Sequence, residues 1–95
     1  MATIGVLTMD MRLDYAQSLK DKRHAVKGLK DRLRHRFNVA VAEIDCQDLW
    51  QRAVVAAVTV SSDRGRAGQV LQAVEKDAAA FLGASLVSVT VEWVD

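Results

Sequence analysis

Apolar residues recur at every second position near the start of the chain. Within residues 3–13, the regularly spaced apolar positions are Leu7, Met9, Met11 and Leu13. Mostly polar residues lie between them. Successive side chains of a β-strand point to opposite faces, so this period of two predicts a strand with one buried face.

A spacing of three and four residues replaces this alternation after Ser18. Ser18 suits a helix N-cap, and Asp21 lies three residues later, as in a variant of the capping box. The apolar positions that follow are Leu19, Val26, Leu29, Leu33 and Phe37. The spacing predicts an amphipathic helix from Ser18 to about Arg36.

A second helix is predicted after Ser62 or Asp63, because either residue suits an N-cap. Gly83 is expected to end it, since glycine readily adopts the conformations that follow a helix C-terminus. The expected buried stripe of this helix consists of Val70, Leu71, Val74, Ala78, Phe81 and Leu82.

Three further apolar stretches, residues 38–46, 52–61 and 86–94, are rich in β-branched residues and predict strands. Residues 47–51, a polar stretch interrupted by Leu49 and Trp50, are expected to form a hairpin loop. The order strand, helix, strand, strand, helix, strand predicts an α+β protein with a ferredoxin-like βαββαβ sandwich. In this fold, both helices cover one face of a four-stranded antiparallel sheet. A chain of 95 residues is expected to form a single domain, 1–95.

The uncovered face of this sheet is expected to be apolar. If Leu7, Ala42, Ile44, Val58 and Val89 face the helices, the opposite face carries Ile4, Val6, Val39, Val41, Val55, Ala57, Leu86 and Val94. Both faces of the second strand are apolar, so its alternation leaves the choice of face open. A large apolar surface favours a partner. A homodimer is therefore predicted through Val6, Val39, Val41 and Val55, with scattered surface valines on a monomer as the alternative.

Composition excludes several classes of protein. A hydrophobic share of 51% excludes a disordered chain, and a net charge of +1 excludes a uniformly basic nucleic-acid coat. A single cysteine excludes an internal disulfide framework and favours the cytoplasm. No apolar run is long enough to cross a membrane, and no signal peptide is expected.

The small net charge conceals a segregation. Residues 18–37 hold eight basic and two acidic residues, a net charge of +6, and the rest of the chain carries −5. Three cations lie early in the first helix, where the helix dipole disfavours them. We therefore expect the helix to bind the phosphates of RNA or of a ribosomal particle through Lys20, Lys22, Arg23, Lys27, Lys30 and Arg34. The alternative is an ordinary solvated helix surface.

No cofactor is expected, because the loop before this helix lacks the glycines that cradle a nucleotide. The central strands carry no aromatic ring for base stacking, so RNA contacts are expected to be electrostatic. The loop at residues 47–51 suggests another function, since exposed Trp and Arg residues often anchor partners. A dimeric protein–protein adaptor, with Leu49, Trp50 and Arg52 as partner-binding residues, is therefore the alternative to RNA binding.

No catalytic or metal-binding pattern is apparent, and the chain is expected not to be an enzyme. His24 and His35 are separated by about 16 Å of helix, too far to share a metal. Cys46 has no histidine at nucleophile spacing. Asp10 leaves a distant alternative, a metal-dependent nuclease of the Cas2 type.

Two sequence blocks carry a family resemblance. They are Ser18-Leu19-Lys20-Asp21-Lys22-Arg23 and the region from Arg36-Phe37-Asn38-Val39 through Ala42-Glu43 to Gln47-Asp48-Leu49-Trp50-Gln51-Arg52-Ala53. The chain resembles the YlxP-like family of small bacterial proteins of unknown function. The resemblance implies the ferredoxin-like fold. The genes of this family often lie beside genes for transcription elongation, translation initiation and ribosome maturation, which implies a link to RNA or the ribosome. Cys46 departs from the polar residue expected there.

Overall fold

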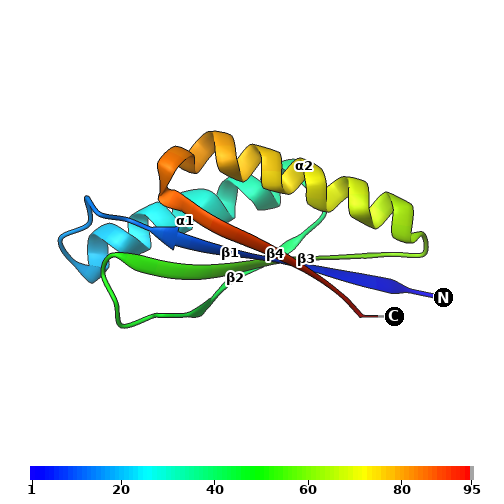
Figure 1. Cartoon of the computed structure of the whole chain (residues 1–95), viewed down its shortest axis with the longest axis horizontal. Coiled ribbons are helices and arrows are strands. Elements are labelled where there is room, and N and C mark those ends of the chain that lie inside the picture. The colour runs from blue at the N-terminus through cyan, green and yellow to red at the C-terminus, as the bar shows by residue number, and fades with distance from the viewer. Residues whose placement is uncertain (95) are drawn as a thin grey trace.

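The computed structural model describes residues 1–94 and contains the six predicted elements in the predicted order (Figure 1). They are β1 (Thr3–Arg12), α1 (Leu19–Arg36), β2 (Ala40–Asp45), β3 (Arg52–Ser61), α2 (Arg64–Leu82) and β4 (Leu86–Val94), with a short 3₁₀ turn, Gly83–Ser85, before β4. The second strand is shorter than the predicted 38–46.

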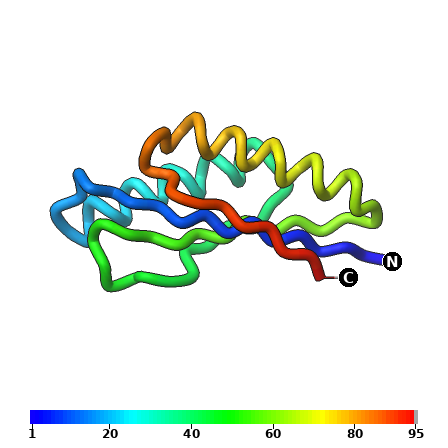
Figure 2. Tube along the Cα trace, viewed as in Figure 1, coloured from blue at the N-terminus to red at the C-terminus, as the bar shows by residue number. Residues whose placement is uncertain are grey.

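The four strands form one antiparallel sheet in the order β2-β3-β1-β4. Both helices lie on the same side of this sheet (Figure 1). This arrangement confirms the ferredoxin-like sandwich. The start of β1 pairs with the end of β4, so the described ends of the chain lie at the same end of the sheet (Figure 2).

Both helices begin at the predicted caps. Ser18 Oγ accepts a hydrogen bond from the Asp21 N–H at 3.1 Å, and Asp63 Oδ1 accepts one from the Gly65 N–H at 3.0 Å. Asp21 Oδ2 accepts from the Gln17 N–H at 3.0 Å, which makes this a shifted capping box. Gly83 has a positive φ of 56° and ends α2, as predicted.

The core lies between the sheet and the helices. It contains the predicted β1 residues together with Val26, Leu29 and Leu33 of α1 and Leu71, Val74 and Ala78 of α2. The prediction for Phe81 was wrong, because this side chain is 45% exposed at the end of α2. The buried stripe of α2 also includes Ala67, in the first turn of the helix, which was not predicted.

The predicted face assignment of β2 and β3 was also wrong. Met9 pairs with Val55 and Leu7 with Ala57, and directly opposed residues share a face. Val55 is fully buried against the helices, Val41 is buried beside it, and Val39 and Leu86 pack against the same core. Of the predicted dimer residues, only Val6 lies on the open face.

At Gly5 in β1, side chains of α2 and β4 pack directly over the backbone. A Cβ atom at this position would lie 2.7 Å from Leu71 Cδ1 and 2.9 Å from Trp93 Cζ3. Real Cβ atoms do not tolerate such distances, so a glycine is required here for helix and sheet to pack closely.

Candidate functional site

The basic side chains of α1 divide between two flanks of the helix. Along the side of α1 away from the core, a basic surface is formed by Lys20, Arg23, Lys27, Lys30 and Arg34. Four of these residues line a shallow groove of about 310 Å³, together with Val26, Asp31 and Glu43. Lys22, the sixth residue predicted to bind phosphate, does not line this groove.

The members of the basic surface differ in how far they are already neutralised. Lys27 pairs with Asp31 at 2.6 Å, and the hydrogen bond from Lys27 lowers the pKa of that carboxyl group. Arg34 Nη2 donates to the Val41 carbonyl at 2.7 Å and ties α1 to the edge strand. Within residues 1–94, no partner is found for Lys20, Arg23 or Lys30. These three cations are the free part of the surface.

Lys22 does not belong to the surface, and its predicted phosphate contact was wrong. Its side chain is 1% exposed. The ammonium group donates to the carbonyl oxygens of Cys46 at 2.7 Å, Gln47 at 3.1 Å and Arg52 at 3.4 Å. Glu43 Oε2 lies 3.0 Å away and supplies the opposite charge. Lys22 therefore fastens α1 to the loop between β2 and β3.

The other flank of α1 is neutralised by α2. Arg32 donates to both carboxylate oxygens of Asp77, at 2.8 and 3.2 Å, and Arg36 donates to one of them at 3.0 Å. The hydrogen bonds from Arg32, with the positive charge of both guanidinium groups, lower the pKa of Asp77. Arg32 also stacks over the Phe81 ring, 5.2 Å from its centroid. These arginines hold the two helices together.

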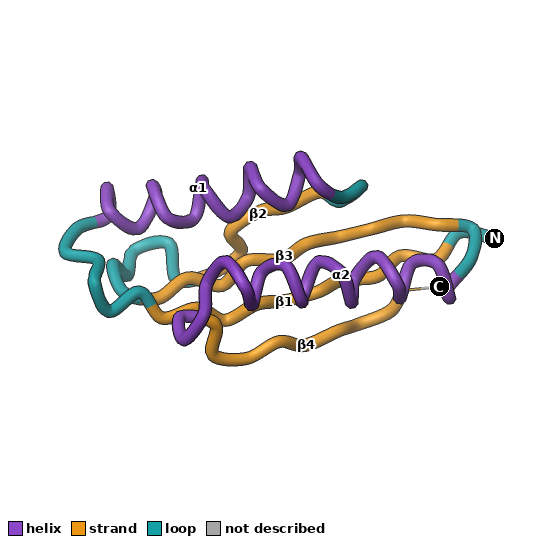
Figure 3. The backbone as a smooth tube through the Cα atoms, turned by 90° about the horizontal axis from the view of Figure 1, so that it is seen from above, coloured by secondary structure: helices purple, strands orange, loops and turns teal. Residues whose placement is uncertain are grey.

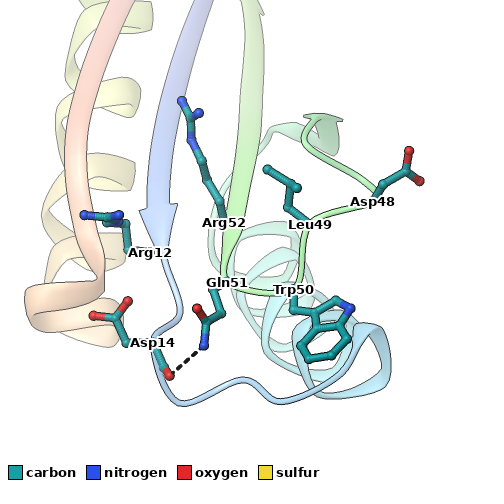
Figure 4. A pocket seen from close by; sticks show the side chains of 7 residues that line it. All are labelled: Arg12, Asp14, Asp48, Leu49, Trp50, Gln51 and Arg52. Carbon is teal, nitrogen blue, oxygen red and sulfur yellow. Dashed lines mark hydrogen bonds between the residues drawn. The ribbon is translucent and has the colours of Figure 1, made fainter.

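The predicted partner-binding loop forms a second feature. Leu49 and Trp50 are each about half exposed, and a pocket of about 480 Å³ lies among residues 12, 14 and 48–52 (Figure 4). In Figure 4, Arg12 points toward β4, whereas the Trp50 ring points away over the chain that leads into α1. The polar groups do not converge on one point, so the pocket is a contact surface rather than a small-molecule site.

Gln51 was missed by the sequence analysis. Its side-chain amide donates to the backbone carbonyl oxygens of Asp14 at 3.1 Å and Ala16 at 3.2 Å. Its backbone carbonyl oxygen accepts a hydrogen bond from the Leu13 N–H. Gln51 thereby joins the two loops at this end of the sheet. An exposed glutamine in a polar stretch gives no signal of such a role.

Asp10 is not arranged to hold a metal. Arg52 Nη2 and Nε donate to its two carboxylate oxygens at 2.9 and 3.3 Å, and this pairing raises the pKa of Arg52. Among the described residues, no group of three or more His, Cys, Asp and Glu side chains gathers into a metal site.

Cys46 has a positive φ of 62°, a conformation that polar residues such as Asn, Asp or His adopt more readily. No helix in residues 1–94 has the length and hydropathy of a membrane span.

The open face of the sheet is apolar over β2 and β3, although with different residues from those predicted, and it is polar toward β4, where Thr8, Ser88, Thr90 and Glu92 lie. Its apolar residues are Ile4, Val6, Ala40, Ala42, Val54, Ala56, Val58, Val60 and Val94. Ile44 is an extra residue at an irregularity of the β2–β3 pairing and is half exposed. The charged pair of Asp10 and Arg52 lies at one end of this face.

A family model described as "Protein of unknown function (DUF503)" matches residues 4–91. A relative from Bacillus subtilis (strain 168), "Uncharacterized protein YlxP", is 38% identical over 71 residues. The match covers 75% of this chain and 77% of that protein.

Solved structures share the fold at low sequence identity. The de novo designed protein Foldit4 superposes with a TM-score of 0.62 at 9% identity, over 100% of this chain and 98% of that one. A dimeric ferredoxin-like protein of unknown function from Thermobifida fusca YX gives 0.53 at 16% identity, over 98% and 90%. SnoaB, a cofactor-independent oxygenase from Streptomyces nogalater, gives 0.50 at 10% identity, over 99% and 91%. These similarities show the fold alone.

Proposed function

The chain belongs to the DUF503 family, whose function is unknown, and we propose that this member is a non-catalytic cytoplasmic module that binds RNA through the basic surface of α1. The ligand is the phosphate backbone of an RNA, free or in a ribosomal particle. Contacts of this kind position a protein on RNA without reading its sequence.

The observation that carries the proposal is the set of cations without a partner. Lys20, Arg23 and Lys30 lie on one flank of α1, and none of them meets an acid within the described residues. The opposite flank of α1 is neutralised, because Asp77 pairs with both Arg32 and Arg36. In a protein with a net charge of only +1, three unpaired cations on one side of a single helix form a local concentration of positive charge. That concentration favours a polyanion as partner.

The test is the salt dependence of binding to a labelled single-stranded RNA, measured by fluorescence anisotropy. Each phosphate neutralised on a single strand contributes about 0.7 to the slope of log K against log salt concentration. Changing Arg23 and Lys30 together to Gln should therefore lower the slope by about 1.4. Lys27→Gln should have a smaller effect, because Asp31 already neutralises Lys27.

The matched control is the double change of Arg66 and Lys76 to Gln, which removes the same charge from α2. It should leave the slope near that of the wild type. If both double variants lowered the salt slope equally, RNA binding would depend only on the net charge of the protein, and a defined binding surface on α1 would be contradicted. Equal binding by the wild type and the Arg23/Lys30 variant at every salt concentration would contradict RNA binding through α1.

A second candidate, a dimeric adaptor, is favoured by the open sheet face. The four strands have ten, six, ten and nine residues, and at about 3.3 Å per residue and about 4.8 Å between strands they give a face of roughly 550 Å². A stable interface needs about 800 Å² of accessible surface from each partner, so this face approaches the required size. The proposed occupant is a second copy of the chain, with the Trp50 loop left exposed for another protein.

Val58 is the residue with which to test this dimer, because it lies in the middle of the open face, opposite Val6 and Ala40. Sedimentation of the wild type should give twice the 10.4 kDa subunit mass, and Val58→Asp should give the subunit mass itself. A wild-type monomer at micromolar concentration would contradict the dimer.

A further inference from the structure

The first turn of α1 and the last turn of α2 lie at the same end of the molecule (Figure 3). Between them is a groove of about 540 Å³. Its lining consists of Tyr15, Lys20, Asp21, His24, Ala25, Phe81, Leu82 and Ser85. We propose that this Tyr15–Phe81 groove binds one unpaired nucleotide of a single-stranded RNA, an inference that rests on the proposed function and names its ligand class.

Two aromatic rings give the groove its stacking surface. Tyr15 is 63% exposed and Phe81 is 45% exposed, in a chain with only five aromatic residues. The spacing of α2 predicts that Phe81 is buried in the core, but its ring lies against α1 instead. A Cβ atom added at Gly28 of α1 would be 3.7 Å from the ring. Arg32 already stacks on the ring. A base in the groove would meet an aromatic side chain that a guanidinium group holds in place, and a base stacks readily on such a ring.

The charges in the groove suit a nucleotide rather than an uncharged ring. Lys20 and His24 both line it, and neither has a hydrogen-bond or ion-pair partner among the described residues. The acid in the lining, Asp21, accepts the hydrogen bond from the Gln17 N–H and is occupied at the helix cap. Lys20 is also the first cation of the basic surface. A backbone bound along α1 would therefore reach the groove at its first phosphate contact.

An unpaired nucleotide combines the two chemistries that the groove offers, a flat aromatic ring and a phosphate. A duplex keeps its bases stacked inside the helix and cannot place one between Tyr15 and Phe81. The groove therefore predicts a preference for single-stranded RNA, whereas the basic surface alone binds any polyanion.

The experiment compares three probes by fluorescence anisotropy: a labelled single-stranded oligoadenylate, the same strand in a full duplex, and inorganic polyphosphate as competitor. Tyr15→Leu and Phe81→Leu should each weaken single-strand binding by about five- to hundredfold, the usual effect of losing one stacked base. Competition by polyphosphate and the salt slope should not change. Tyr15→Phe should restore binding, because it keeps the ring.

Trp50→Leu is the matched control, since Trp50 is an equally exposed aromatic outside the groove and should bind RNA as the wild type does. If the wild type binds neither RNA nor polyphosphate, both proposals fall. If RNA binds with the expected salt slope but Tyr15→Leu and Phe81→Leu bind equally well, only the groove falls. Equal loss of polyphosphate binding in these variants would also overturn it, because the rings would then act on the fold.

Discussion

Lys22→Met should destabilise the protein strongly, although the residue belongs by sequence to a basic helix surface. Methionine keeps the length of the side chain and its helix propensity but removes the ammonium group. The change leaves the carboxylate of Glu43 without its positively charged partner, and three nearby carbonyl oxygens lose the hydrogen bond that Lys22 donates. Breaking a buried pair in this way costs about 3–5 kcal/mol.

The total free energy of unfolding of a small domain is about 5–15 kcal/mol, so this loss is a large fraction of it. With a urea m-value of about 1.5 kcal/mol/M, the unfolding midpoint should fall by about 2–3 M. Lys20→Met, on the exposed side of the same helical turn, should stay within about 0.5 kcal/mol of the wild type. Adding Glu43→Leu to Lys22→Met should recover part of the loss, because no unpaired charge remains. A Lys22→Met midpoint equal to that of Lys20→Met would refute the reasoning.

Three further outcomes are expected. Gly5→Ala should lower the free energy of unfolding in urea by about 1–3 kcal/mol, because the new methyl group would overlap Leu71 and Trp93. Gly28→Ala should raise it by about 0.5–1 kcal/mol, because the new Cβ would make only ordinary contact. If Gly5→Ala were the more stable of the two variants, the packing around Gly5 would be contradicted. Because the pKa of Asp77 is lowered by Arg32, the stabilisation by this pair is present above about pH 4 and is lost as the pH falls through the lowered value. The stability difference between the wild type and Asp77→Asn should therefore be constant at neutral pH and shrink only in acid, and a difference that grows in acid would argue against the pair. Trp50→Ala should change the free energy of unfolding by no more than about 0.5 kcal/mol and should leave the salt slope of RNA binding unchanged, whereas a large loss of stability would show that Trp50 packs on the sheet.

The fold was predictable because each element carries its own local signal. Ser18, Asp63 and Gly83 fixed the helix ends, and the alternation of β1 fixed its buried face. The face of β3 was not predictable from its own residues, since both sides of the strand are apolar. The pairing of Met9 with Val55 decides it, and pairing is a long-range contact.

The candidate site was predictable only in outline. Helical periodicity places five cations on one side of α1. Lys22 was predicted to bind phosphate with them, because its tertiary contact with the β2–β3 loop has no signature in α1 itself. Phe81 was misplaced for a similar reason. Helical spacing gives the direction of a side chain, but it does not show that the Phe81 ring lies under Arg32 of α1 while the next residue, Leu82, packs against the core.

RNA binding through α1 is tested most directly by a nuclear magnetic resonance titration of the ¹⁵N-labelled protein with single-stranded RNA. The largest chemical-shift changes should fall on α1, at the backbone amides of Lys20, Arg23 and Lys30 and at the Arg23 side chain, and they should decrease as salt is added. Changes confined to the open sheet face or to the Trp50 loop, or no change at any RNA concentration, would contradict it.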